Sequence, residues 1–278
     1  MKKQNVVSLI LIVFFALPAF GQTIEVMSYN IKYDNESDTI NNWNDRRLPM
    51  LALVKKHNPA FIGMQEVLLN QLEFLDAPLN DHKYIGVGRD DGKEKGEFSP
   101  IFYDTKKYAL LKSNTFWLSE SPDIIAIGWD AALERICSYG LFQDKTTKKR
   151  LWVFNTHFDH KGKKARRNSV KLILKRIKRL NTENLPVILM GDLNLTPEEG
   201  PIVRLQKKMD DGRRISKSPP SGPVGTFNGF NSNVPMDRRI DYIFLKGIAV
   251  QEYHHIDERR TNGKHISDHL PVLATITY

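Results

Sequence analysis

The segment Ser267-Asp268-His269-Leu270-Pro271 stands directly before an apolar run, Val272-Leu273-Ala274-Thr275-Ile276, that predicts a strand near the end of the chain. An Asp beside a His at a strand edge is a poor choice for a core, because both side chains need polar partners. The pair suits catalysis, since a carboxylate can hold a metal and an imidazole can move a proton near neutral pH.

Other polar side chains end or follow apolar runs in the same way. They are Asn30, Glu66, His157, Asp192, Asn194 and Asp241. The runs at 24–31, 59–67, 151–157, 185–190 and 240–245 predict strands. In α/β sheets the strand ends on one side commonly build a shared site, so we expect these polar residues to meet.

Helical patterns separate several of these strands, at 47–56, 68–75 and 170–180. Hairpin-like strands at 84–89, 98–103 and 110–118 lie between the two strand–helix–strand parts. This order predicts an α/β layered fold. We find no linker or break in charge that divides the chain, and the Ser-, Pro- and Gly-rich stretch 217–225 is typical of a surface loop.

The N-terminus has the pattern of a signal peptide over residues 1–21. Two lysines precede a 15-residue apolar run, and small residues stand before Gln22. The run is short for a membrane span, although an uncleaved anchor is the alternative. We therefore expect a secreted or periplasmic protein, with one domain over 22–278 and no stable membrane insertion after cleavage.

The charge and cysteine content narrow the class of partner. Removal of residues 1–21 takes away two lysines and no acid, which changes the net charge from +9 to +7 and favours polyanionic partners. The single Cys137 excludes an internal disulfide and fits a small core residue. Ten Lys or Arg residues lie within 161–179, either as a nucleic-acid patch or as the solvated face of an amphipathic helix.

The polar residues at the strand ends suit a hard cation. Mg²⁺ prefers carboxylate and amide oxygens, and Glu66, Asp268 and Asn30 offer these atoms. No Cys/His cluster has the spacing of a zinc site, which makes a softer metal less favoured. The two histidines, His157 and His269, can share acid and base work.

Five spaced motifs resemble those of the endonuclease/exonuclease/phosphatase superfamily, in its deoxyribonuclease-like branch, and appear in the family's order. They are Ser28-Tyr29-Asn30, Gln65-Glu66, Asn155-Thr156-His157, Gly191-Asp192-Leu193-Asn194, and Arg239-Ile240-Asp241-Tyr242 followed by Ser267-Asp268-His269. The resemblance implies a four-layer sandwich of two packed β-sheets flanked by helices. It also implies metal-dependent cleavage of a phosphate ester with Mg²⁺ or Mn²⁺.

The resemblance implies a role for each matching residue. Glu66 matches the principal metal ligand, with Asn30 and Asp268 near the metal or its waters. Asp192 and Asn194 match the pair that orients the attacking water and the phosphate. His269 matches the family histidine and Asp241 the carboxylate that fixes its tautomer. His157 matches a second histidine, and Glu97 the acid that pairs with it.

Each residue also has a structural alternative. Asn30, Glu66, Asp192 and Asn194 could cap or turn the chain, Asp241 could pair with Arg238 or Arg239, and either histidine could be a satisfied polar residue. Arg135 could clamp a phosphate oxygen or form a structural salt bridge, and His160 could line the pocket. Aromatic residues in 226–230 could stack on a base or sugar, or anchor the core.

These observations predict a metal-dependent phosphate-ester hydrolase, with phosphodiesterase or nuclease activity favoured by the basic charge. The alternatives are a phosphomonoesterase, a sphingomyelinase-like lipid phosphodiesterase, and a catalytically silent protein that binds ligands in the same cleft. We expect a monomer whose partner is a phosphate-ester substrate, with nucleic acid as one candidate.

Overall fold

The computed structural model describes residues 23–278, so the expected signal peptide at 1–21 lies outside the described residues. The described chain contains two six-stranded sheets. The first has the order β11 (Ala249–His255), β12 (Val272–Thr277), β1 (Thr23–Asn30), β2 (Phe61–Gln65), β4 (Ile101–Asp104) and β3 (His82–Ile85). The second has the order β5 (Tyr108–Trp117), β6 (Ile136–Asp144), β7 (Arg150–His157), β8 (Val187–Asp192), β10 (Asp241–Lys246) and β9 (Asp210–Asp211).

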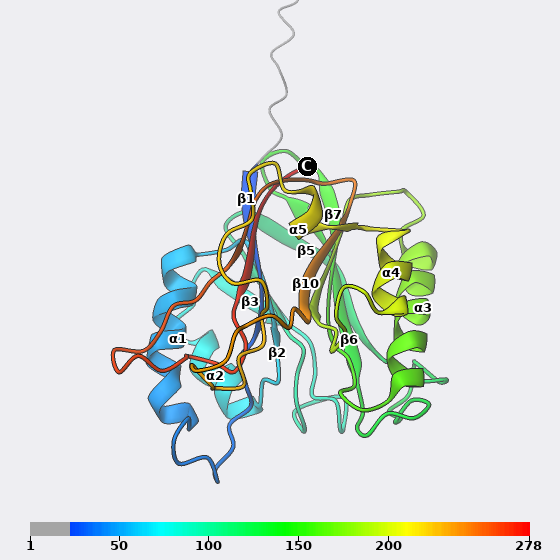
Figure 1. The fold of residues 1–278 in the computed structure, drawn as a ribbon. Helices are drawn as coiled ribbons and strands as arrows, with labels where there is room; N and C mark the ends of the chain where they lie inside the picture. Colours follow the sequence, from blue (N-terminus) through cyan, green and yellow to red (C-terminus); the bar gives the residue numbers. More distant parts are fainter. Residues whose placement is uncertain (1–22) are drawn as a thin grey trace, which may run out of the picture.

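Helices cover the outer face of each sheet (Figure 1). On one side lie α1 (Trp43–His57) and α2 (Leu69–Asp76), and on the other lie α3 (Lys163–Leu180) and α4 (Gly200–Gln206). A short helix, α5 (Gly212–Ile215), follows β9. The expected four-layer sandwich is confirmed.

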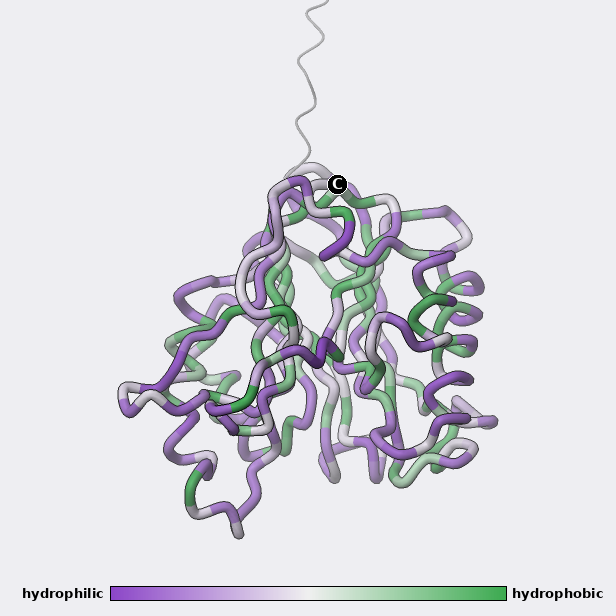
Figure 2. Tube along the Cα trace, viewed as in Figure 1, coloured by the Kyte–Doolittle hydropathy of each residue, from purple (hydrophilic) through white to green (hydrophobic). Residues whose placement is uncertain are grey.

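Three apolar clusters hold the four layers together. The middle cluster joins the facing sheets, for example through Phe61 of β2 and Phe142 of β6, whose ring centroids are 4.9 Å apart. One outer cluster packs Leu53 of α1 against the first sheet, and the other packs Ile173 of α3 against the second. The polar faces of these helices are turned outward (Figure 2). Burial of apolar surface on both faces of each sheet supplies the main stabilisation of the fold.

The directions of the strands bring the polar strand ends together. In the first sheet β1 runs parallel to β2 and antiparallel to β12, so the ends of β1 and β2 meet the start of β12. In the second sheet β7 runs parallel to β8, and β10 runs antiparallel with Asp241 opposite Asp192. All of these ends therefore lie at one edge of the sandwich.

Several elements differ from the sequence-based expectation. Strands β6 and β11 and helix α4 were not expected, and the strands expected at 84–89 and 98–103 are His82–Ile85 and Ile101–Asp104. Strand β11 is an edge strand with exposed polar positions and a bulge between Val250 and Glu252, which weakens its alternation. Within residues 23–278, no helix is both long and apolar enough to cross a membrane.

Candidate active site

A cleft of about 590 Å³ opens at the edge where the polar strand ends meet. Nine of the predicted site residues line it, and they come from both sheets: Glu66, Glu97, Arg135, His157, His160, Asp192, Asn194, Asp268 and His269. The other two, Asn30 and Asp241, lie fully buried directly behind this lining. The structure thus brings together every residue that the sequence predicts for the site.

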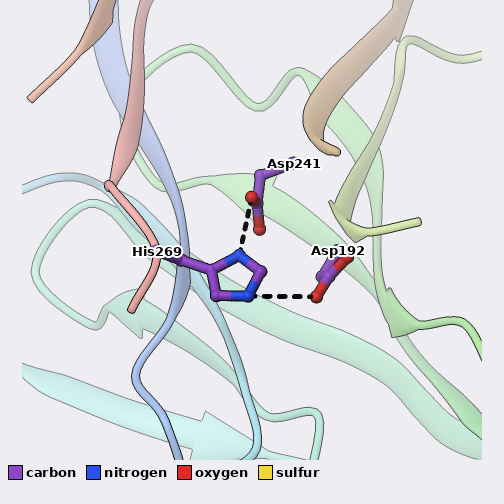
Figure 3. Close-up of side chains that lie close together, drawn as sticks. All are labelled: Asp192, Asp241 and His269. Atoms are coloured by element: carbon purple, nitrogen blue, oxygen red, sulfur yellow. Dashed lines mark hydrogen bonds and ion pairs between the residues drawn. The ribbon is translucent and has the colours of Figure 1, made fainter. Parts of the chain in front are cut away.

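His269 is held by a buried carboxylate. Its Nδ1 lies 2.8 Å from Asp241 Oδ2, and a dashed line marks this interaction in Figure 3. Asp241 Oδ2 also accepts a 2.5 Å hydrogen bond from Thr226 Oγ1, which fixes the carboxylate from behind. The alternative in which Asp241 pairs with Arg239 is not found, because Arg239 forms a bidentate ion pair with Asp211. Nε2 of His269 is left facing the cleft and Asp192.

Asp192 is the carboxylate at the centre of the site. Its Oδ2 accepts a 3.0 Å hydrogen bond from Asn30 Nδ2 and lies 3.3 Å from His157 Nε2 and 3.7 Å from His269 Nε2. Burial and the nearby Asp241 charge raise the pKa of Asp192 to about 7. Burial acts to lower the pKa of His269, but the charges of Asp241 and Asp192 raise it to about 10. A base near neutral pH thus lies beside a charged imidazolium.

Two further carboxylates of the cleft, Glu66 and Asp268, face the ammonium group of Lys32. Lys32 Nζ lies 3.4 Å from Glu66 Oε2 and 3.7 Å from Asp268 Oδ2. Glu66 follows β2 with a positive φ of 58°, and its Oε1 accepts from Asn30 Nδ2 at 3.1 Å. Burial acts to raise the pKa of Glu66, but Lys32 and His269 together lower it. The Glu66 carboxylate is therefore ionised at neutral pH.

The donor set fits a hard divalent cation. Glu66, Asp268 and the Asn30 amide supply oxygens, and the Lys32 ammonium shows that a positive charge is stable between the two carboxylates. Asp192, Asp241 and His269 also offer ligand atoms within 4.8 Å of one another. Since the Asp241–His269 hydrogen bond already uses two of those atoms, the Glu66 side fits the ion better.

The second histidine has an unexpected partner. Arg135 Nη1 lies 3.0 Å from His157 Nδ1, whereas Glu97 Oε2, the expected partner, is 3.8 Å away. Glu97 instead accepts a 2.7 Å hydrogen bond from Arg89. Burial, and then the charge of Arg135, lowers the pKa of His157 well below its usual value of 6.5. His157 is thus a neutral imidazole.

Asn194 combines its structural and expected roles. It has a positive φ of 49°, and its backbone N–H donates to Asp192 Oδ1 at 2.9 Å, as a turn residue would. Its side-chain Nδ2 donates to the Phe158 carbonyl at 3.0 Å and lies 3.2 Å from His157 Nε2. The turn therefore fixes an amide beside the Asp192 carboxylate.

Two contributors were not anticipated from the sequence: Lys32 lies between Glu66 and Asp268, and Thr226 holds Asp241. Phe227, one of the aromatic residues expected to stack on a ligand or to anchor the core, packs edge-on to His269 with ring centroids 5.1 Å apart. Phe227 and Lys32 line the cleft. Only the position of Lys32 two residues after Asn30 could have suggested its role, because Thr226 comes from a loop with no distinguishing pattern.

The basic helix α3 lies apart from the cleft. None of its residues lines the cleft, and most of its basic side chains, such as Lys171, Lys175 and Lys178, are exposed on its outer face. The interpretation of this run as the solvated face of an amphipathic helix therefore fits. The helix start is capped by Asp130, which accepts from the backbone N–H groups of Lys164 and Ala165.

The comparison with known proteins agrees with this geometry. The model of the endonuclease/exonuclease/phosphatase family matches residues 27–269. The chain belongs to the endonuclease/exonuclease/phosphatase family. As a member of this family, it is a hydrolase of phosphate esters.

Members of the endonuclease/exonuclease/phosphatase family with solved structures share the whole fold. A family protein from Bacteroides vulgatus is 38% identical with a TM-score of 0.87, and the match covers 92% of this chain and 98% of that chain. A mannosyl-6-phosphatase from Bacteroides thetaiotaomicron is 37% identical with a TM-score of 0.87, and the match covers 92% of this chain and 100% of that chain.

The sequence is also similar to an uncharacterized protein of Acanthamoeba polyphaga mimivirus. The two are 26% identical over 180 residues, which are 62% of this chain and 67% of that protein.

Proposed function

We propose that the protein is a divalent-metal-dependent phosphomonoesterase that acts on phosphorylated sugars or similarly small phosphate esters. The observation that carries the chemistry is Asp192, with its pKa near 7, placed 3.7 Å from the His269–Asp241 pair. The substrate class rests on the 37% identity to the mannosyl-6-phosphatase over that protein's full length. The distance of the basic α3 face from the cleft supports a small substrate rather than a long polyanion.

Each residue of the site has its own role in the proposed reaction. Asp192 accepts a proton from the attacking water, and Asn194 helps to orient that water. The His269 imidazolium, steadied by Asp241, stabilises the negative charge that grows on the phosphate oxygens. Glu66, Asp268 and Asn30 would hold Mg²⁺ or Mn²⁺, and this ion would neutralise phosphate charge.

The second candidate is phosphodiesterase or nuclease activity. The formal net charge of +9 favours a polyanion, and Tyr33 and Phe227 at the cleft could stack on a base. In that case the exposed lysines of α3 would bind the nucleic-acid backbone outside the cleft. Sphingomyelin cleavage, or ligand binding without catalysis, would give a different pattern in the same assays.

The test is a substrate screen with purified protein. Phosphate release from mannose 6-phosphate and glucose 6-phosphate is measured with Mg²⁺, with Mn²⁺ and with chelator. Cleavage of bis-p-nitrophenyl phosphate, DNA, RNA and sphingomyelin is measured beside it. We expect sugar phosphates to be hydrolysed best and chelator to abolish activity. Faster cleavage of the diesters would contradict the proposed substrate class.

Two variants connect the activity to the site. Glu66→Ala should reduce phosphate release to background, whereas Lys171→Ala on the exposed face of α3 should leave it unchanged. A combined Lys171→Gln, Lys175→Gln and Lys178→Gln protein should hydrolyse sugar phosphates normally. If that protein lost DNA cleavage and its salt dependence, the nuclease alternative would be favoured. Release that survives both Glu66→Ala and chelator would rule out the enzymatic assignment.

We also propose that the protein is exported and that it is a monomer. The export rests on the signal-peptide pattern of residues 1–21. N-terminal sequencing of the protein recovered outside the cytoplasm should begin at Gln22, and size-exclusion chromatography should give the mass of one chain. A retained Met1 or a larger particle would contradict this part.

A further inference from the structure

The Arg135 guanidinium contacts two histidines at once. Arg135 stands just before β6 and is only 4% exposed. Its Nη1 lies 3.0 Å from His157 Nδ1, and its Nη2 lies 3.1 Å from His160 Nδ1. Its Nε lies 3.5 Å from Asp159 Oδ1. Both terminal nitrogens are therefore directed to imidazole rings rather than to the open cleft.

The chemistry of these contacts determines where the protons lie. A guanidinium stays protonated in proteins and has only hydrogen-bond donors. Each Nδ1 that faces it must therefore be an acceptor without a proton. A neutral imidazole with a bare Nδ1 carries its proton on Nε2. The same guanidinium thus sets the tautomer of His157 and of His160.

We propose that Arg135 is a positioning residue that fixes both histidines as neutral Nε2–H tautomers. His157 Nε2 then donates to Asp192 Oδ2, 3.3 Å away, while the Asn194 Nδ2 amide, 3.2 Å from the same nitrogen, directs its hydrogen bond to the Phe158 carbonyl at 3.0 Å. This creates a chain of hydrogen bonds from Arg135 through His157 to the carboxylate that we assign as the base. His160, which lines the cleft, presents its Nε2–H as a donor there.

The neighbouring charges support this direction of the chain. Glu97 is the group that could instead accept a proton from His157 Nδ1, but it is 3.8 Å away and is bound by Arg89 at 2.7 Å. Asp159 faces Arg135 and also accepts backbone N–H bonds from Lys161 and Gly162, which fix it in place. Arg135 is thus oriented by Asp159 and directs Nη1 and Nη2 to the histidines, with Glu97 Oε2 farther away, at 3.9 Å from Nη1.

The effect on catalysis rests on the proposed function. A donor on His157 Nε2 helps to keep Asp192 ionised and oriented toward the water. Without Arg135, His157 could present a bare Nε2 to Asp192, which would remove that hydrogen bond. We therefore expect Arg135→Met to lower kcat for sugar-phosphate hydrolysis by at least about tenfold, equivalent to one lost hydrogen bond.

The tautomers can be read directly by ¹⁵N NMR of the imidazole rings in the full chain without substrate. In the unaltered protein, His157 and His160 should each show a bare Nδ1 and a protonated Nε2. Two buried histidines give internal references. His82 Nε2 faces the Pro59 carbonyl at 2.9 Å and must carry a proton, whereas His255 Nδ1 faces the Pro223 carbonyl at 2.7 Å and must carry one there.

Arg135→Met should change the proton positions of His157 and His160 and leave those of His82 and His255 unchanged. A protonated Nδ1 on His157 or His160 in the unaltered protein overturns the proposal, even if no variant folds. Unchanged tautomers in Arg135→Met overturn the assignment to Arg135. Because the spectra need no substrate, an unaltered protein with the expected tautomers and no phosphatase activity would contradict only the proposed function.

Discussion

Gln65 Nε2 donates a 2.7 Å hydrogen bond to Asn155 Oδ1, and this bond joins the two sheets behind the cleft. Asn155 completes the link by donating from Nδ2 to the carbonyls of Met64, at 2.7 Å, and Pro100, at 2.8 Å. Gly63 makes room for it, since a Cβ at that position would lie 2.7 Å from Asn155 Oδ1. Gln65 and Asn155, two of the motif residues found in the sequence, thus join the two sheets that carry the site, and we do not expect them to contact the substrate.

We expect Asn155→Leu to weaken the fold and the activity together. The substitution removes the shortest hydrogen bond of the buried Gln65 amide, which keeps only Ser28 Oγ and the Gly63 carbonyl, and takes the Asn155 donor from the Met64 and Pro100 carbonyls. The free energy of unfolding should fall by about 2 to 4 kcal/mol. Urea unfolding measures this, and Asn114→Leu on the exposed face of β5 is the matched control. Equal stability of the two variants would contradict the proposed role of the bridge.

Thr226→Val tests how Asp241 is held. Thr226 Oγ1 donates to Asp241 Oδ2 and accepts from the backbone N–H groups of Ile240 and Asp241, each at 3.1 Å. Valine has nearly the same shape but no hydroxyl, so the carboxylate loses its support beside His269. We expect kcat to fall by about tenfold. Thr226→Ser should restore most of the rate, and a valine variant with full kcat would show that His269 alone orients Asp241.

The sequence predicted the residues that end strands much better than the residues that support them. Glu66, Asp192 and Asp268 were found because an acid after an apolar run is conspicuous, and the strand directions then bring these ends together. Thr226 contacts partners far away in the chain, and no local pattern records such a pairing; Arg135 was predicted for the site, but its contacts with His157 and His160 were not. Edge strand β11 was missed because the bulge between Val250 and Glu252 interrupts its alternation.

Arg46→Met should be strongly destabilising, because Arg46 ties α1 to the loops that carry Lys32 and Asp268. The guanidinium is 1% exposed and donates to the carbonyls of Ile31, at 2.6 Å, and Lys32, at 3.0 Å. Loss of these bonds takes the Arg46 donor from the Ile31 carbonyl and leaves the Lys32 carbonyl with Gln71 Nε2 alone, and should cost about 3 to 5 kcal/mol. Thermal and urea unfolding give the value. Arg47→Met, one position along and less buried, should cost far less, and a similar loss in both variants would argue against this role.

His255 should make the protein less stable in mild acid. Burial lowers its pKa to about 4, although its Nδ1 donates to the Pro223 carbonyl at 2.7 Å. In the unfolded chain an imidazole titrates near pH 6.5, so below that pH the unfolded state binds a proton that the folded state refuses. The stabilisation is therefore complete above pH 6.5 and is lost as the pH falls toward 4, by up to about 3 kcal/mol. Urea unfolding from pH 4 to 8 measures how the free energy of unfolding depends on pH. His255→Asn, which can keep the bond to Pro223, should lose the part of this dependence that His255 causes.

His254→Asn, at the partly exposed neighbour, is the control and should keep the full pH dependence. If the stabilities of His255→Asn and the unaltered protein differ by the same amount at every pH, His255 is not the source of the acid sensitivity.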